Sequence, residues 1–286
     1  MSALGQMIQK LELHWGKQVL SHFVRDDPVS DHPVALMVPV APKDVERARR
    51  SIPMMQANLA HPVVRTAIVA PQNEAIETLC ADLGVDFIDE HPELLNLAGE
   101  TETAAMRGWL RQQLLKLAAP EIMDHSDVVV IDSDTYPQRP TAFLTPDGRQ
   151  ILYRGDRNQI PFHTFTEMVI GPCPGGSISF IAHGMLFRAD HIDALRAEIT
   201  RRHGGRWVEA FLRLIADCEQ SGTLGQSGVY SEYDLYGHFL LRDASGAFVT
   251  RYYANAKLDQ DSFLGRIPVP PSKRKFRFVS NHQRGS

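Results

Sequence analysis

Short apolar runs alternate with amphipathic segments in the first half of the chain, and this alternation constrains the fold more than any other feature. Strands rich in valine and isoleucine are predicted at residues 34–38, 63–70, 85–88 and 128–131. Between them, helical periodicity predicts helices at 43–59, disturbed by Pro53, and at 73–83 and 102–117. Continuous apolar strands that alternate with helices indicate an α/β fold, with a mostly parallel sheet flanked by helices on both faces.

The second half has a different pattern, but no linker separates it from the first. Strands are predicted at 150–153, 177–187, 248–253 and 276–279, and helices at 189–202, 207–218 and 231–241. Near the N-terminus, residues 2–24 have the apolar stripe of a helix. We therefore predict an N-terminal helical extension over residues 1–31 and a single domain over 32–286.

Charge and cysteine content exclude several classes of protein. The formal net charge is −4, which argues against a nucleic-acid-binding protein. The three cysteines are odd in number and form no CxxC pair, which favours neither a disulfide framework nor a zinc site. No apolar run approaches the roughly 20 residues that span a bilayer, and the N-terminus has no signal-peptide pattern. We expect a cytoplasmic protein.

The run VVVIDSDTYP (128–137) places two carboxylates, Asp132 and Asp134, at the end of a buried strand. Ligands of parallel sheets bind beyond the carboxyl ends of the strands. Side chains two residues apart in an extended segment point the same way, so the two charges repel unless a cation lies beside them. A hard divalent ion, Mg²⁺ or Mn²⁺, that bridges to a substrate diphosphate is the partner that this pair predicts.

An aspartate pair of this spacing also occurs by chance and in proteins of different classes. Asp259-Gln260-Asp261 repeats the spacing with no strand before it. Phosphatases of the haloacid dehalogenase type need Thr or Val two positions after the second aspartate, where this chain has Tyr136. Sugar nucleotidyltransferases carry a glycine-rich loop after the first strand, whereas this chain reads VPVAPKD (38–44). A sugar-nucleotide-binding protein without catalysis is a further alternative.

Four segments in order carry a resemblance to nucleotide-sugar glycosyltransferases of the GT-A type. These are RGWLRQQLLKL (107–117), the DSDTY pair within 114–140, AHGMLFR (182–188) and SEYDLYGHFL (231–240). The chain resembles a poorly characterised bacterial family of this type over roughly 32–285, and more distantly the glycogenin-like enzymes. The resemblance implies a GT-A-like, Rossmann-related fold, with a nucleotide-binding half at about 32–140 and an acceptor half at about 141–286.

Several residues are candidates for binding the donor. On the 102–117 helix, Gln113 and Lys116 share a stripe with Trp109 and Gln112, which indicates either a solvated helix face or contact with the donor nucleotide and phosphates. Pro39 and Val40, at the end of the first strand, are further candidates.

His183 and Gly184 are also candidates, because a glycine late in a strand lets a ligand approach the backbone closely. A core histidine is the competing interpretation of His183.

Two carboxylates are candidates for catalysis at the helix start Ser231-Glu232-Tyr233-Asp234. Ser231 and Asp234 fit a capping box, which explains both without chemistry. Glu232 is the candidate general base, although the helix dipole is expected to lower its pKa. Asp234 is kept as the alternative base if Glu232 proves silent.

The C-terminal residues suggest two further roles. In several GT-A families that retain configuration a C-terminal histidine completes the metal site, so His282 joins Asp132 and Asp134 as a candidate metal ligand. The basic segment 270–278, PPSKRKFRF, fits contact with a lipid-linked acceptor or the inner membrane face, or a solvated edge strand.

Together these features predict a metal-dependent glycosyltransferase that moves a sugar from a nucleotide-diphosphate donor to a hydroxyl of a glycan or glycolipid, in surface polysaccharide synthesis.

Overall fold

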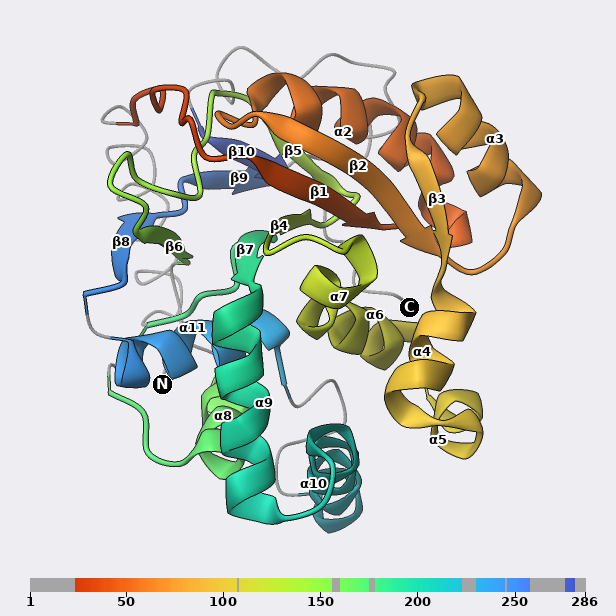
Figure 1. The fold of residues 1–286 in the computed structure, drawn as a ribbon, viewed down its shortest axis with the longest axis vertical. Coiled ribbons are helices and arrows are strands. Elements are labelled where there is room, and N and C mark those ends of the chain that lie inside the picture. The colour runs from red at the N-terminus through yellow and green to blue at the C-terminus, as the bar shows by residue number, and fades with distance from the viewer. Residues whose placement is uncertain are drawn as a thin grey trace, which may run out of the picture.

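A computed structural model describes residues 24–106, 108–155, 160–174, 178–222, 230–244, 246–257 and 276–280. Its central sheet has the strand order β3-β2-β1-β4-β7 (Figure 1). The strands are β1 (Val34–Pro39), β2 (Val63–Ala70), β3 (Asp86–Asp89), β4 (Asp127–Ile131) and β7 (Gly184–Arg188). The first four are parallel, and β7 runs antiparallel to β4. The predicted mostly parallel sheet is therefore confirmed.

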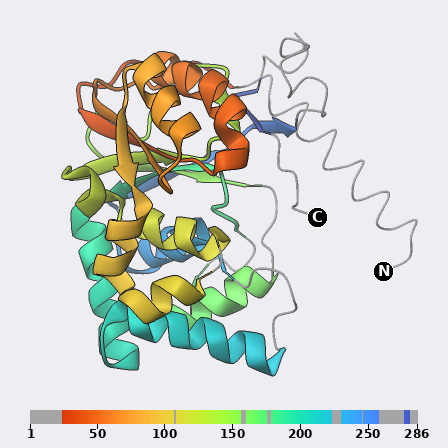
Figure 2. The ribbon, with the colours of Figure 1, turned by 90° about the vertical axis from the view of Figure 1, so that its right-hand side faces the viewer.

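Helices cover both faces of this sheet, as the alternation of apolar runs predicted (Figure 2). Val34, Leu36 and Val38 of β1 pack with α2 (Val45–Asn58) and α3 (Glu74–Leu83). The alternate residues Ala35 and Met37 belong to the opposite core. That second core is built with α6 (Gly108–Leu117), α9 (Ala189–His203), α10 (Trp207–Ser221) and α11 (Glu232–Asp243). Because both faces are buried at the centre of the sheet, β1 and residues 128–131 of β4 carry uninterrupted apolar residues.

Some predicted helix boundaries are wrong. The helix predicted at 102–117 is two helices, α5 (Glu100–Ala105) and α6, because Met106 has extended backbone angles (φ −70°, ψ 135°). Pro53 lies inside α2 and does not end it. Before α2 comes the short 3₁₀ helix η1 (Pro42–Asp44). The helices α4 (Glu90–Ala98), α7 (Ala119–Met123) and α8 (Ile160–Ile170) were not predicted.

The predicted strand at 177–187 is mostly irregular chain. Only β7, from Gly184, is a strand, and residues 178–183 before it have no regular structure. Two small sheets complete the fold: β6 (Gln150–Arg154) pairs with β8 (Phe248–Tyr252), and β10 (Phe278–Ser280) lies between β5 (Thr135–Pro137) and β9 (Asn255–Lys257). The strand β10 thus brings the C-terminal part of the chain beside the turn that follows β4.

Asp27 ties the segment before β1 to the rest of the domain. Its carboxylate accepts hydrogen bonds from Arg251 Nη1 and Arg277 Nη1, both at 2.7 Å, and from the Ala142 backbone N–H at 2.8 Å. The Asp27 side chain is only 8% exposed. Asp27 therefore anchors residues 24–31 to the domain, and the remainder of the predicted extension, 1–23, lies outside the described residues.

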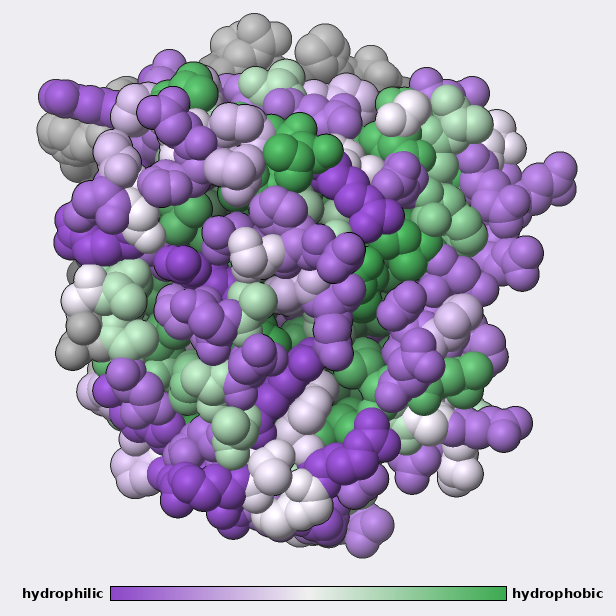
Figure 3. All heavy atoms as spheres, in the orientation of Figure 1, coloured by the Kyte–Doolittle hydropathy of each residue, from purple (hydrophilic) through white to green (hydrophobic). Residues whose placement is uncertain are grey.

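Hydrophilic residues cover most of the face shown in Figure 3, with small groups of apolar residues between them. The large apolar side chains most exposed among the described residues are Val29, Val64, Trp109 and Met168. None of the described helices is both long and apolar enough to cross a membrane.

Candidate functional site

A pocket of ≈ 330 Å³ lies at the carboxyl ends of β1 and β4. Within this sheet the chain continues from β1 to β2 on one side and from β4 to β7 on the other, so the strand order reverses between β1 and β4. Such a topological switch point is where open α/β sheets bind ligands. The pocket is lined by Pro39, Asp44, Trp109, Gln112, Gln113, Lys116, Asp132, Ser133, Asp134, Phe162, Ile181, His183, Tyr230, Ser231, Glu232 and Tyr233.

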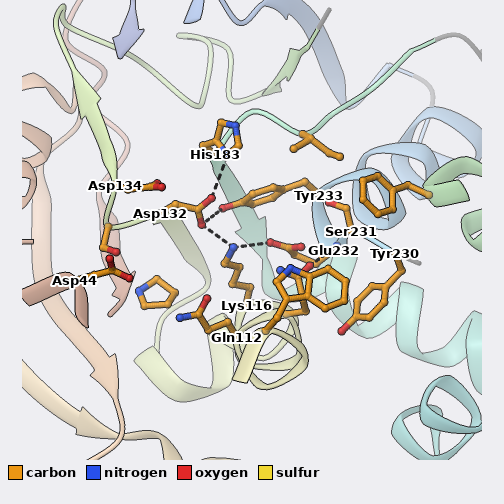
Figure 4. A pocket seen from close by; sticks show the side chains of 16 residues that line it. Asp44, Gln112, Lys116, Asp132, Asp134, His183, Tyr230, Ser231, Glu232 and Tyr233 are labelled. Carbon is orange, nitrogen blue, oxygen red and sulfur yellow. Dashed lines mark hydrogen bonds and ion pairs between the residues drawn. The ribbon is translucent and has the colours of Figure 1, made fainter. Parts of the chain in front are cut away.

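The predicted carboxylate pair lies in this pocket, but in a turn and not in an extended segment. The Thr135 N–H donates to the Asp132 carbonyl at 2.9 Å, which closes the turn. Ser51 Oγ donates to the Ser133 carbonyl at 2.7 Å and holds the middle of the turn. Asp132 and Asp134 both line the pocket, as Figure 4 shows. We call residues 132–135 the acidic turn.

Lys116 joins Asp132 to Glu232 through a buried ion-pair network. Its Nζ lies 2.6 Å from Asp132 Oδ1 and 2.7 Å from Glu232 Oε1, and it sits 4.6 Å from the centre of the Tyr233 ring. The Tyr233 hydroxyl also donates to Asp132 Oδ1, at 3.0 Å. One ammonium thus pairs with two carboxylates that are 100 residues apart in sequence (132 and 232).

Burial and ion pairing oppose each other in this network. Burial would lower the pKa of Lys116, but the neighbouring Asp132 and Glu232 outweigh it and raise that pKa above its ordinary value. For Asp132, burial is outweighed by Lys116 and His183, so its pKa is held below its usual range. For Glu232, burial prevails over Lys116 and its pKa is raised. Burial therefore outweighs the lowering that was expected from the helix dipole.

The stripe predicted on α6 faces the pocket. Trp109, Gln112, Gln113 and Lys116 all line it. Gln113 and Lys116 are 5% and 3% exposed, so a solvated helix face is excluded for both. Gln113 Oε1 accepts the backbone N–H of Glu232 at 3.1 Å and thereby fixes the start of α11.

His183 reaches the acidic turn from the segment before β7. Its carbonyl accepts the Asp132 N–H at 3.0 Å, and its Nδ1 lies 3.2 Å from Asp132 Oδ2. Its φ of 52° is unusual for a residue with a Cβ. His183 lines the pocket and is not a core histidine.

Gly184 and Val40, which were predicted to contact the donor, do not line the pocket. A Cβ on Gly184 would lie 3.4 Å from Ile131 Cγ1 and 3.5 Å from Phe143 Cζ, so this glycine gives close packing in the core and not access for a ligand. Val40 is 1% exposed and packs in the core beside α2, whereas its neighbour Pro39 lines the pocket.

The predicted capping box is wrong. Ser231 is the N-cap of α11, but its side chain makes no capping hydrogen bond. Asp234 points elsewhere: its Oδ1 accepts the Phe180 N–H at 2.6 Å and the Ser179 hydroxyl at 3.2 Å. Burial raises the pKa of Asp234 to about 7, although these hydrogen bonds lower it. Asp234 is not among the residues that line the pocket, whereas Glu232 is.

A third metal ligand is not found in the described part of the chain. No group of three or more His, Cys, Asp or Glu side chains there could hold a metal ion, and His282 lies outside it. The two carboxylates of the acidic turn are nevertheless the donor type that Mg²⁺ and Mn²⁺ take together with diphosphate oxygens. Asp132 Oδ2 contacts His183, and a carboxylate oxygen can accept two partners. The residues present therefore fit a cation shared with a substrate.

Several residues that line the pocket were missed from the sequence. Asp44 follows β1, and Phe162 belongs to α8, a helix that was not predicted. Tyr230 is fully buried and its ring lies 4.9 Å from that of Trp109. Tyr233 could have been predicted as a site residue, because it lies between Glu232 and Asp234, the two candidates for catalysis.

Comparison with solved structures gives distant similarities. Mouse xyloside xylosyltransferase 1 is similar over 87% of this chain and 98% of that chain, with 12% identity and a TM-score of 0.45. The galactosyltransferase LgtC is similar over 88% of each chain, with 15% identity and a TM-score of 0.46. The glycosyltransferase GlyE of Streptococcus pneumoniae is similar over 89% of this chain and 55% of that chain, with 13% identity and a TM-score of 0.42.

At the level of sequence, no curated protein matches the chain. A family does match it over residues 18–272, which is most of its 286 residues. By that match the chain belongs to the group described as "Family of unknown function (DUF6492)".

Proposed function

We propose that this protein is a glycosyltransferase that takes a sugar from a nucleotide-diphosphate donor and transfers it to a hydroxyl of a glycan or glycolipid. The observation that carries the proposal is the pocket at the β1–β4 switch point, which joins an acidic turn to a buried lysine and a second carboxylate. A site of this kind suits a ligand with a charged diphosphate and a polar sugar.

The donor is proposed to lie over the carboxyl ends of β1 and β4. Its nucleoside would contact Pro39 and Asp44, and its diphosphate would face Asp132 and Asp134. In Figure 4 Asp44 and Asp134 lie on one side of Lys116, and Tyr230, Ser231 and Glu232 on the other. We assign the first side to the nucleotide and the second to the transferred sugar and its acceptor.

A divalent cation, Mn²⁺ or Mg²⁺, would be held by Asp132 and Asp134. When bound, it supplies positive charge that stabilises the departing nucleoside diphosphate. The chain's own residues prepare this position. Lys116, Tyr233 and His183 fix the Asp132 carboxylate from three directions, so the turn is ordered before any ligand arrives.

Glu232 is proposed to accept the proton of the acceptor hydroxyl. It lines the pocket, and its raised pKa brings it closer to the operating pH, where a general base works best. Its hydrogen bond from Lys116 and the support of Gln113 at its backbone orient the carboxylate.

A second candidate function is sugar-nucleotide binding without catalysis. It is favoured by one observation: Lys116 occupies both Asp132 and Glu232, so neither carboxylate is without a partner. Turnover with a hydroxyl acceptor separates the two functions, since a binding protein would take up the nucleotide and release no free nucleoside diphosphate.

Part of the basic segment 270–278 is buried and therefore cannot contact a membrane. Phe276, Arg277 and Phe278 are at most 5% exposed, and Arg277 is paired with Asp27. These three residues therefore do not form a membrane-binding surface. Residues 270–275 lie outside the described part, and a peripheral role for Lys273, Arg274 and Lys275 stays a prediction, tested by liposome sedimentation after charge reversal.

The proposal is tested by titrating UDP, GDP and CDP calorimetrically with and without Mn²⁺, and by measuring hydrolysis of the corresponding nucleotide sugars. We expect one nucleotide to bind in a Mn²⁺-dependent manner, and Asp134→Asn to abolish the Mn²⁺ dependence. Asp217→Asn, an exposed aspartate on α10, serves as the matched control. The absence of binding by all three nucleotides, or unchanged Mn²⁺-dependent affinity in Asp134→Asn, would overturn the proposal.

A further inference from the structure

Residues 178–183 have no regular structure, yet two of them, Ile181 and His183, line the pocket. Irregular chain has no ladder of hydrogen bonds, so its buried polar groups need other partners. Ser179 and Phe180 are at most 2% exposed. Something in the fold must therefore hold this segment in one conformation.

One face of α11 supplies that support. Asp234 Oδ1 accepts the Phe180 N–H at 2.6 Å and the Ser179 hydroxyl at 3.2 Å. One turn later, His238 Nε2 lies 3.1 Å from the Ile178 carbonyl. Residues three and four apart lie on one side of a helix, so Asp234, Gly237 and His238 form a continuous strip.

Gly237 makes room for the segment between these two anchors. A Cβ at this position would lie 2.4 Å from the Phe180 ring, closer than any real contact. The same ring packs edge-on against His238, with centres 5.1 Å apart. On its other edge, the segment is held by the Gly155 N–H, which donates to the Ser179 carbonyl at 2.7 Å.

The segment ends at His183, which touches the acidic turn. Its carbonyl and its ring both contact Asp132. Its positive φ is a backbone conformation that persists only when the surroundings impose it. The anchors on α11 hold residues 178–180, which lie just before His183 in the chain, and so help to impose this conformation.

We propose that Asp234, Gly237 and His238 are positioning residues, which dock residues 178–183 onto α11 and thereby place His183 against Asp132. Asp234 then acts through the segment and not as a base on the substrate. The consequence for ligand binding rests on the proposed function, whereas the docking itself does not.

The test uses the full chain with Asp234→Asn, which keeps size and removes the charge, and Gly237→Ala, which pushes on Phe180. Amide hydrogen exchange of residues 179–183 is expected to rise at least tenfold in both, while exchange in β1 and β4 stays unchanged. Asp243→Asn, at the exposed end of the same helix, should leave both regions unchanged.

Two further comparisons separate positioning from general loss of stability. The ¹³Cε1 signal of His183, assigned with His183→Asn, should move in Asp234→Asn. It should not move in Ile199→Ala, a core truncation in α9 that is expected to lower the unfolding midpoint. His238→Gln keeps an N–H donor for Ile178 and should retain slow exchange, whereas His238→Leu should not.

Unchanged exchange of residues 179–183 in both Asp234→Asn and Gly237→Ala, or an unmoved His183 signal, would overturn the inference. Mn²⁺–UDP affinity is measured in parallel and should fall about tenfold in Asp234→Asn. If the parent protein does not bind Mn²⁺–UDP, it is the proposed function with this nucleotide that fails, and the exchange result still decides the docking.

Discussion

Replacing Lys116 with methionine should destabilise the protein through the two carboxylates left behind. Lys116 is 3% exposed and pairs with Asp132 and Glu232 at 2.6 and 2.7 Å. Methionine fills a similar volume, so the change is mainly electrostatic. Removing one partner of a buried ion pair costs about 3–5 kcal/mol, because it leaves an uncompensated charge.

That free energy corresponds to a measurable change in melting temperature. An unfolding entropy of about 2.1 cal/mol/K per residue gives roughly 0.6 kcal/mol/K for a chain of 286 residues. The midpoint of Lys116→Met should therefore fall by about 5–8 °C at neutral pH, as measured by differential scanning calorimetry.

The effect should depend on pH in a defined direction. The pKa of Asp132 is lowered in the folded protein, so its contribution is present above its unfolded pKa and is lost as the pH falls through the folded value. The pKa of Lys116 is raised, so its contribution is present below its unfolded pKa and is lost as the pH rises through the folded value. Burial raises the pKa of Glu232 in the folded protein, so its contribution to stability is present at low pH and is lost as the pH rises, which is opposite to that of Asp132. The ion-pair stabilisation that Lys116→Met removes is thus largest around neutral pH and smallest in acid.

A double variant tests whether the unpaired carboxylates cause the loss of stability. In Lys116→Met combined with Glu232→Gln, one of the two orphaned charges is gone, and part of the lost stability should return. If the double variant is less stable than Lys116→Met, or if Lys116→Met alone shifts the midpoint by less than about 2 °C, the buried network does not have the energetic role assigned to it.

Three other predictions address separate parts of the molecule. Asp27→Asn should lower the free energy of unfolding by about 3–5 kcal/mol in urea titrations, because it removes the charge that pairs with the buried Arg277 and with the partly exposed Arg251, whereas Asp26→Asn, at an exposed ion pair, should change little. Glu232→Gln should slow transfer by about 10²–10⁴ in a steady-state assay while donor affinity is kept, and an unchanged rate would rule out Glu232 as the base. Asn73→Ala should cost about 1 kcal/mol in the same urea titration, since Asn73 caps α3 by accepting two backbone N–H groups.

The sequence predicts the central sheet well because burial dictates it. All four strands of the parallel part were placed within one residue at either end, since both faces of the sheet demand apolar side chains. The helix α3 ends at Leu83, as predicted, and Gly84 follows it with a φ of 64° that favours glycine. The short strands β5 and β9 each pair with β10 through backbone hydrogen bonds, and a three-residue run has no distinctive sequence pattern that predicts such pairing.

The irregular segment 178–183 shows where periodicity misleads. Its residues ISFIAH alternate in a way that reads as strand, and Phe180 and Ala182 are indeed buried. The alternation comes from packing of Phe180 against α11 and not from a sheet. Because its backbone partners on α11, Asp234 and His238, lie more than 50 residues away, no local signal distinguishes the two cases.

Helix geometry explains why one pair of predicted site residues lies together and the other does not. Gln113 and Lys116 are three apart on α6, so both face the pocket. Glu232 and Asp234 are two apart on α11, and at about 100° per residue their side chains point roughly 200° apart. Once a helix is predicted to start at residue 231, only one of these two carboxylates can reach the pocket. The other must find partners on the far side of the helix, where Asp234 binds Ser179 and Phe180.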